Sequence, residues 1–109
     1  MKSILTIDEY GTKIWKLPNG HCHREDGPAI EYSHGTKSWY INGELHREDG
    51  PAFERNDGYK YWYLKGISYS EKEYKQEIRS RKLKQLYNIQ YSEKEYKSKM
   101  RSIKLKKLI

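Results

Sequence analysis

Histidine, cysteine and carboxylate side chains are the residues of this sequence whose types and spacing could do chemistry. Adjacent His21, Cys22 and His23 bring together imidazole and thiolate groups, which are good zinc ligands. Against a zinc site, no second cysteine or clustered histidine pair supplies a fourth ligand. Cys22 also aligns with Leu45 of a later repeat, which indicates a small hydrophobic residue. The sequence therefore predicts no metal ion and no cofactor.

A second constellation, His46 with Glu48 and Asp49, contains the residue types of a general acid and a general base. The same types recur at residues 23–26, and a motif copied in successive units usually serves the fold of the unit. We expect framework histidines, and an Arg47 that donates a charge-assisted hydrogen bond to a carboxylate of the neighbouring repeat. The chain is therefore predicted not to be an enzyme.

Positive charge is concentrated in the last part of the chain. Residues 1–69 hold 9 Lys and Arg against 10 Asp and Glu, a balance of −1, whereas residues 70–109 hold 13 against 5, a balance of +8. This asymmetry predicts an anionic partner for the tail, although a solvated helical face is the alternative. The candidate binding residues of the basic tail are Arg79, Arg81, Lys82, Lys84, Lys99, Arg101, Lys104, Lys106 and Lys107.

Aromatic residues must supply much of the core, because only 35% of the 109 residues are hydrophobic while 34% are charged. The three Trp, eleven Tyr and one Phe can each bury a large area. Strand alternation places Tyr40, Tyr61 and Tyr63 on the face opposite the tryptophans. These rings could stack on bases or anchor a protein interface, or they could be core beneath the tail.

A repeat of 23 or 24 residues positions these side chains. It is marked by Trp15, Trp39 and Trp62, and His-Arg-Glu-Asp-Gly-Pro-Ala is identical at residues 23–29 and 46–52. The copies lie near residues 11–34, 35–57 and 58–69, within a β-hairpin region spanning 1–69.

Turn residues indicate that each copy is a β-hairpin unit. Asn42-Gly43 predicts a type I′ hairpin turn, and Pro51 should open a strand. In the third copy, alternation groups Trp62 with Leu64, which predicts a core ladder of Trp and aliphatic side chains.

The tail contains a different repeat, Tyr-Ser-Glu-Lys-Glu-Tyr-Lys, at residues 69–75 and 91–97. Its Ser and Glu have the spacing of a capping box, and its two Tyr have the spacing of a hydrophobic staple. The region 70–109 therefore predicts two basic helices, near 71–87 and 93–107, with Asn88 as the stop between them. The expected fold class is α+β, a single-layer antiparallel β-meander followed by these helices.

The repeated Trp strand, the Asn-Gly turn and the Asp-Gly-Pro-Ala segment resemble MORN-type β-hairpin repeats, and more closely a variant typical of small phage and large-virus proteins. The resemblance covers residues 11 to about 66. It implies a binding surface and carries no catalytic residues.

These observations favour a non-enzymatic phage or viral accessory factor that inhibits a host defence complex, with a host protein or nucleoprotein as its anionic partner. Direct nucleic-acid binding is the second hypothesis, and association with an anionic membrane surface is the third. The single cysteine, the lack of a signal peptide and the lack of a run of 18 apolar residues predict a soluble protein of the cytoplasm. The oligomeric state stays open, with a homo-oligomer among the alternatives.

Overall fold

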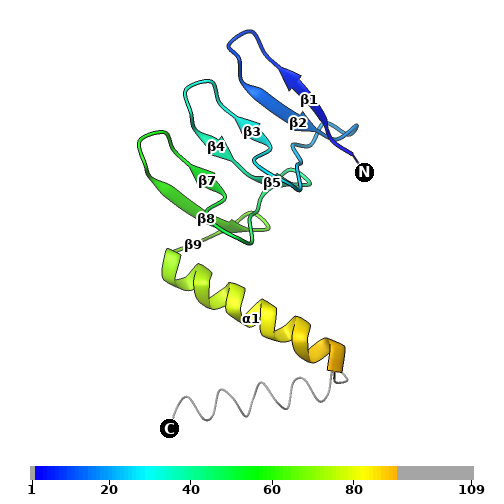
Figure 1. Ribbon diagram of the computed structural model, residues 1–109, viewed down its shortest axis with the longest axis vertical. Helices are drawn as coiled ribbons and strands as arrows, with labels where there is room; N and C mark the ends of the chain where they lie inside the picture. The colour runs from blue at the N-terminus through cyan, green and yellow to red at the C-terminus, as the bar shows by residue number, and fades with distance from the viewer. Residues whose placement is uncertain (1, 91–109) are drawn as a thin grey trace. The chain divides into compact units, whose positions relative to one another are not determined.

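The structure is a computed structural model that describes residues 2–90. Seven strands form one antiparallel sheet in the order β1-β2-β3-β4-β7-β8-β9, and β5 and β6 form a separate two-stranded hairpin (Figure 1). This arrangement confirms the α+β class and the antiparallel meander. The elements are β1 (Ile4–Ile7), β2 (Lys13–Lys16), β3 (Ile30–Glu31), β4 (Lys37–Ser38), β5 (Tyr40–Ile41), β6 (Glu44–Leu45), β7 (Phe53–Glu54), β8 (Lys60–Leu64), β9 (Ile67–Tyr69) and α1 (Glu71–Gln90).

Each repeat contains two turns, and the second is the Asn-Gly turn. Asn42 and Gly43 have φ angles of 49° and 82°, so both central residues are left-handed and the predicted type I′ turn is confirmed. Lys65 and Gly66 take the same conformation in the third repeat, with φ angles of 49° and 79°. The first repeat has one residue more here, and among its turn residues only Gly20 has a positive φ.

Side-chain hydrogen bonds join each repeat to the next. His23 Nδ1 accepts from the backbone N–H of Asn42 at 2.9 Å, and His46 Nδ1 accepts from that of Lys65 at 3.0 Å. These bonds repeat with the period of the sequence, so both histidines are framework residues, as predicted. Within a repeat, the Thr12 and Thr36 hydroxyls accept from the backbone N–H groups of Ser33 and Asn56, near the other end of the same copy.

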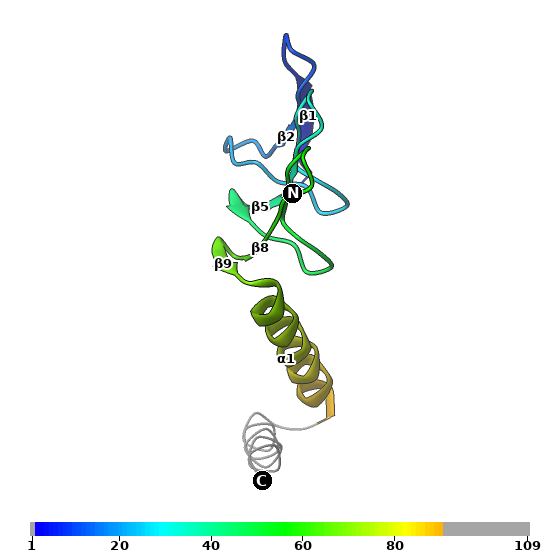
Figure 2. The same cartoon turned by 90° about the vertical axis from the view of Figure 1, so that its left-hand side faces the viewer.

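The core is thin, and its larger hydrophobic side chains are Leu17, Leu64 and Tyr74. Ala29, Ala52, Ser38 and Leu64 are completely buried, and Tyr74 is 4% exposed. The tryptophans are half-buried. Viewed along its edge, the seven-stranded sheet is a single layer, with β5 displaced to one side (Figure 2). A single layer leaves two faces to cover, and a protein with few aliphatic residues covers them shallowly.

The predicted core ladder of Trp and aliphatic side chains holds in part. Leu17 and Leu64 are buried, whereas the tryptophans are only half-buried. Arg24 lies over the Trp15 ring and Arg47 over the Trp39 ring, each with its guanidinium carbon 3.9 Å from the ring centre. A guanidinium stacks well on an indole because it is planar and weakly hydrated.

Helix α1 begins with the predicted capping box. The Ser70 N–H donates to Glu73 Oε1 at 3.0 Å, and the Glu73 N–H donates to Ser70 Oγ at 3.1 Å. The predicted stop at Asn88 is wrong, because α1 continues to Gln90. Asparagine costs a helix only about 0.7 kcal/mol relative to alanine, and no Gly or Pro breaks the helix here. The second predicted helix, 93–107, lies outside the described residues.

Candidate functional site

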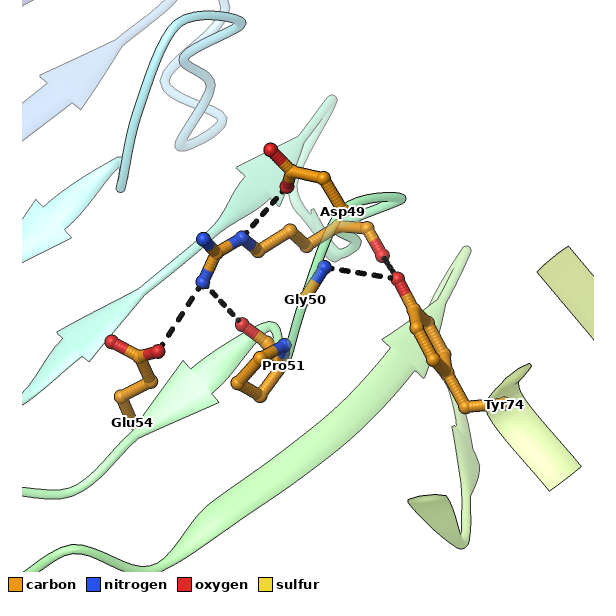
Figure 3. A network of polar contacts seen from close by, with 6 residues as sticks. Asp49, Gly50, Pro51, Glu54 and Tyr74 are labelled. Atoms are coloured by element: carbon orange, nitrogen blue, oxygen red, sulfur yellow. Dashed lines mark hydrogen bonds and ion pairs between the residues drawn. The ribbon is translucent and has the colours of Figure 1, made fainter. Parts of the chain in front are cut away.

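The two identical segments, residues 23–29 (loop 1) and 46–52 (loop 2), form loops of the same geometry. In loop 2, Arg47 Nε donates to Asp49 at 2.9 Å, and its Nη1 donates to the Pro51 carbonyl at 3.0 Å (Figure 3). Loop 1 repeats these bonds at 2.9 and 3.1 Å from Arg24. Each arginine thus ties its loop together from within while covering a tryptophan.

The glycine at the centre of each loop lies against the arginine side chain. A Cβ placed on Gly50 would lie 2.9 Å from Cζ of Arg47, and one placed on Gly27 would lie 2.9 Å from Cζ of Arg24. The glycine therefore makes room for the guanidinium. This close approach explains why Asp-Gly-Pro is retained in both copies.

The partner predicted for Arg47 was wrong. Besides Asp49, its carboxylate contact is Glu54, 3.4 Å from Nη1, and Glu54 belongs to the same repeat, 35–57. The sequence could not show the contact between Arg47 and Glu54. It depends on the fold, in which strand β7 follows loop 2 in the chain and brings Glu54 back beside it.

Tyr74, from the first turn of α1, docks on loop 2. Its hydroxyl donates to the Arg47 carbonyl and accepts from the Gly50 N–H at 3.3 Å (Figure 3). Burial, and then the nearby Asp49 and Glu48, raise the pKa of Tyr74 despite the opposing Gly50 bond and Arg47 charge. The chain divides after Tyr74, a few residues beyond the predicted boundary at 69/70, because this ring belongs to the β-platform, residues 2–74.

A groove of about 750 Å³ lies between the two loops. Trp39 and Ile41 form its apolar lining together with loop residues. Four carboxylates at its edge are largely exposed, and the polar groups also include His46 and the two arginines. We call this feature the loop groove. The acidic residues of the rim are Glu25, Asp26, Glu48 and Asp49.

The histidine constellations have structural partners. Nε2 of His23 and of His46 lies 3.6 and 3.9 Å from the exposed carboxylates of Glu25 and Glu48. Their Nδ1 atoms already accept backbone N–H groups. Among residues 2–90, no group of three or more His, Cys, Asp and Glu side chains could hold a metal ion. Cys22 is a free, half-buried thiol whose carbonyl accepts from Gly43, as the Leu45 carbonyl accepts from Gly66.

The three candidate tyrosines do not share one environment. Tyr61 is 42% exposed in β8, where its ring contacts that of Phe53 with centres 5.9 Å apart. Tyr40 and Tyr63 are half-buried. Burial, followed by Tyr32, Cys22 and Tyr63, raises the pKa of the Tyr40 hydroxyl. Of the three, Tyr61 is the ring available for an aromatic contact.

The basic residues of α1 divide between different sides of the helix. Arg79 and Lys82 share an exposed stripe with Lys72 and Lys75. Counted from Lys72, the other three lie 3, 7 and 10 residues further on, and at 3.6 residues per turn all four fall within about 80° of the helix circumference. We call these four residues the basic face. Sequence reasoning missed Lys72 and Lys75, although the helical spacing could have found them.

The other basic candidates do not join this stripe. Arg81 lies on another side of α1, where its Nε donates to Glu77 at 3.1 Å. Lys84 is exposed but also off the basic face. The remaining candidates of the tail, Lys99, Arg101, Lys104, Lys106 and Lys107, lie outside the described residues.

Comparison with known protein families, with curated sequences and with solved structures finds no match to this chain. The resemblance to MORN-type repeats therefore stays a prediction from the repeated residues. Within residues 2–90, no helix has the length and apolar character needed to cross a bilayer.

Proposed function

We propose that this protein is a non-enzymatic binding protein whose basic helix docks on an anionic partner. The observation that carries the proposal is the basic face, Lys72, Lys75, Arg79 and Lys82, exposed along one side of α1. The platform sequence contributes almost no net charge, so attraction of an anion depends on the helix and the tail.

The dimensions of the basic face suit a polyanion. Its first and last residues are ten positions apart, a rise of about 15 Å along the helix axis. Four cations over that length can contact several phosphates or carboxylates at once, and each phosphate contact releases a condensed counterion. The acidic residues of α1, Glu71, Glu73 and Glu77, are concentrated in its first two turns.

For the partner, we propose a host protein or nucleoprotein complex of a defence system, bound by a phage or viral accessory factor in the host cytoplasm. The likeness of the repeats to those of small phage and large-virus proteins supports this choice, as do the small size and the basic tail. Such a partner would present the carboxylates or the nucleic acid that the basic face attracts.

The basic face can be tested by removing its four charges together. We expect K72Q/K75Q/R79Q/K82Q to lose a partner that the wild-type chain retains from nuclease-treated bacterial lysate. Glutamine is a good helix former, so α1 is preserved and circular dichroism can verify this. A control, K13Q/K16Q/K37Q/K60Q, removes the same number of exposed charges from the β-platform and should keep the partner. Equal loss in both variants, or recovery of nothing above background from wild type, contradicts the proposal.

Direct binding of nucleic acid is the second candidate, favoured by the spacing of the basic face along one helix. Fluorescence anisotropy with a generic duplex and a single strand, at several salt concentrations, distinguishes it. Each phosphate contact should add about 0.9 to the slope of log affinity against log salt, so the basic-face variant should lose about 3 to 4 from that slope. An affinity that is absent, or unchanged between low and physiological salt, excludes this candidate.

A further inference from the structure

Loops 1 and 2 are identical in sequence, but they differ in the hydrogen bonds of one backbone carbonyl and one backbone N–H. Within residues 2–90, only loop 2 has partners for both groups. Tyr74 satisfies the Arg47 carbonyl and the Gly50 N–H with one hydroxyl. The equivalent groups of loop 1 are the Arg24 carbonyl and the Gly27 N–H. Among residues 2–90, neither has a hydrogen-bond partner. The loop groove lies beside them.

The ligand that fits loop 1 must offer the same chemistry that Tyr74 offers loop 2. It needs an O–H donor that can also accept an N–H, carried on a flat ring that packs against Trp39 and Ile41. A phenol meets these requirements. The carboxylates on the groove's rim would repel a phosphate or a carboxylate, so the neutral tyrosine hydroxyl is favoured over an anionic ligand.

This chain carries such a group twice. Residues 91–97 repeat, letter for letter, residues 69–75, the segment that contains Tyr74. The position equivalent to Tyr74 is Tyr96. We propose that Tyr96 of one molecule docks on loop 1 of a second molecule, its hydroxyl donating to the Arg24 carbonyl and accepting from the Gly27 N–H. The loop groove is then a self-association site, independent of any anionic partner.

A second molecule can supply Tyr96 with no constraint from the path of its own chain. Tyr74 lies at loop 2, and α1 runs 16 residues beyond it, about 24 Å. Loops 1 and 2 are one repeat, or two strand spacings, apart, which is about 10 Å. Return to loop 1 of the same molecule must therefore cover at least about 14 Å, whereas six residues span up to about 20 Å when fully extended. Chain length alone leaves the same molecule as the alternative occupant, and the concentration dependence measured below distinguishes the two.

Tyr96→Phe is the sharpest test, because it removes one oxygen atom. Sedimentation of the full-length wild-type chain should show association that strengthens with concentration. In Tyr96→Phe we expect the midpoint to move to at least about fivefold higher concentration, as expected for one lost hydrogen-bonding group. The amide resonance of Gly27 should shift with concentration in wild type and stay constant in the variant. The Gly50 amide, already bound to Tyr74, serves as the internal reference.

Binding of a peptide to full-length Tyr96→Phe is an independent measurement, because that variant lacks the tyrosine hydroxyl proposed to bind loop 1. A capped peptide of residues 91–97, titrated into full-length Tyr96→Phe, should move the Gly27 amide, and a peptide with Phe in place of Tyr96 should bind at least about fivefold more weakly. The proposal is overturned if wild type stays monomeric, if its association survives Tyr96→Phe, or if both peptides bind equally. The Gly27 amide resonance could also differ between wild type and Tyr96→Phe without any dependence on protein concentration. That result would overturn the proposal and indicate docking within one molecule.

Discussion

Ser38 is the residue whose chemistry fits its surroundings least. Its side chain is fully buried in β4, and its Oγ has no hydrogen-bond partner in the described structure. Its cross-strand neighbours are Ile30 and Phe53, so the hydroxyl stands in an apolar row of the sheet. A buried, unpaired hydroxyl costs free energy because folding removes it from water without replacing the lost bond.

We therefore expect Ser38→Ala to raise the free energy of unfolding by about 1 kcal/mol. Urea denaturation followed by tryptophan fluorescence measures the change. Ser33→Ala, at an exposed loop position, is the control and should change stability little. Destabilisation by Ser38→Ala would show that the hydroxyl has a partner in solution.

Among the elements, the type I′ turns show how strongly a turn depends on its first residue. Asn42 and Lys65 have the same φ of 49°. The left-handed region costs lysine more free energy than asparagine, whose short polar side chain can hydrogen-bond locally. The third repeat thus carries backbone strain that the second repeat avoids.

Exchanging these residues should shift stability in opposite directions. We expect Lys65→Asn to raise the free energy of unfolding by about 1 kcal/mol, and Asn42→Lys to lower it by about the same amount. Both substitutions keep the backbone N–H that donates to a histidine. Chemical denaturation of the two single variants and the double exchange measures the effect, and changes of the same sign would refute the strain argument.

The capping box of α1 gives a second prediction at this scale. Ser70→Ala should cost about 1 kcal/mol and reduce helical circular dichroism, because the Glu73 N–H loses its acceptor.

The same cap depends on pH through Glu73. The Ser70 backbone N–H, followed by the Ser70 hydroxyl, lowers the pKa of Glu73 below its usual 4.5. Because the folded-state pKa is lower than the unfolded one, this stabilisation is complete above pH 4.5 and is lost as pH falls through the folded value. In Glu73→Gln this acid dependence should be absent. An unchanged acid profile in that variant would contradict the assignment.

Across the whole molecule, the β-platform is a one-dimensional stack in which each repeat bonds its neighbour. His23 joins the first repeat to the second, and His46 joins the second to the third. Stability in such arrays is approximately a sum over units and neighbouring interfaces.

The two histidine links should therefore act independently. His23→Ala and His46→Ala should each cost about 1 to 3 kcal/mol, since each leaves a backbone N–H without its acceptor. The double variant should equal the combined single effects within about 0.5 kcal/mol. Equilibrium denaturation of the four proteins completes the cycle, and a larger coupling would mean that the repeats fold as one inseparable layer.

Local interactions explain what the sequence determined by itself. The Asn-Gly turn and the Ser-Glu cap each depend on residues within a few positions of one another, and the repeat period fixed the hairpin order. The continuation of α1 through Asn88 was missed because asparagine is only a weak helix stop.

The tertiary structure decided which side chains meet. The stacking of Arg47 on Trp39, its bond to Glu54 and the capping of loop 2 by Tyr74 join residues 7 to 27 positions apart. These contacts depend on how the strands return beside the loops, and no local preference encodes that return. For the same reason, the sequence could show two identical loops, but only the fold could show one capped by Tyr74 and a groove beside the other.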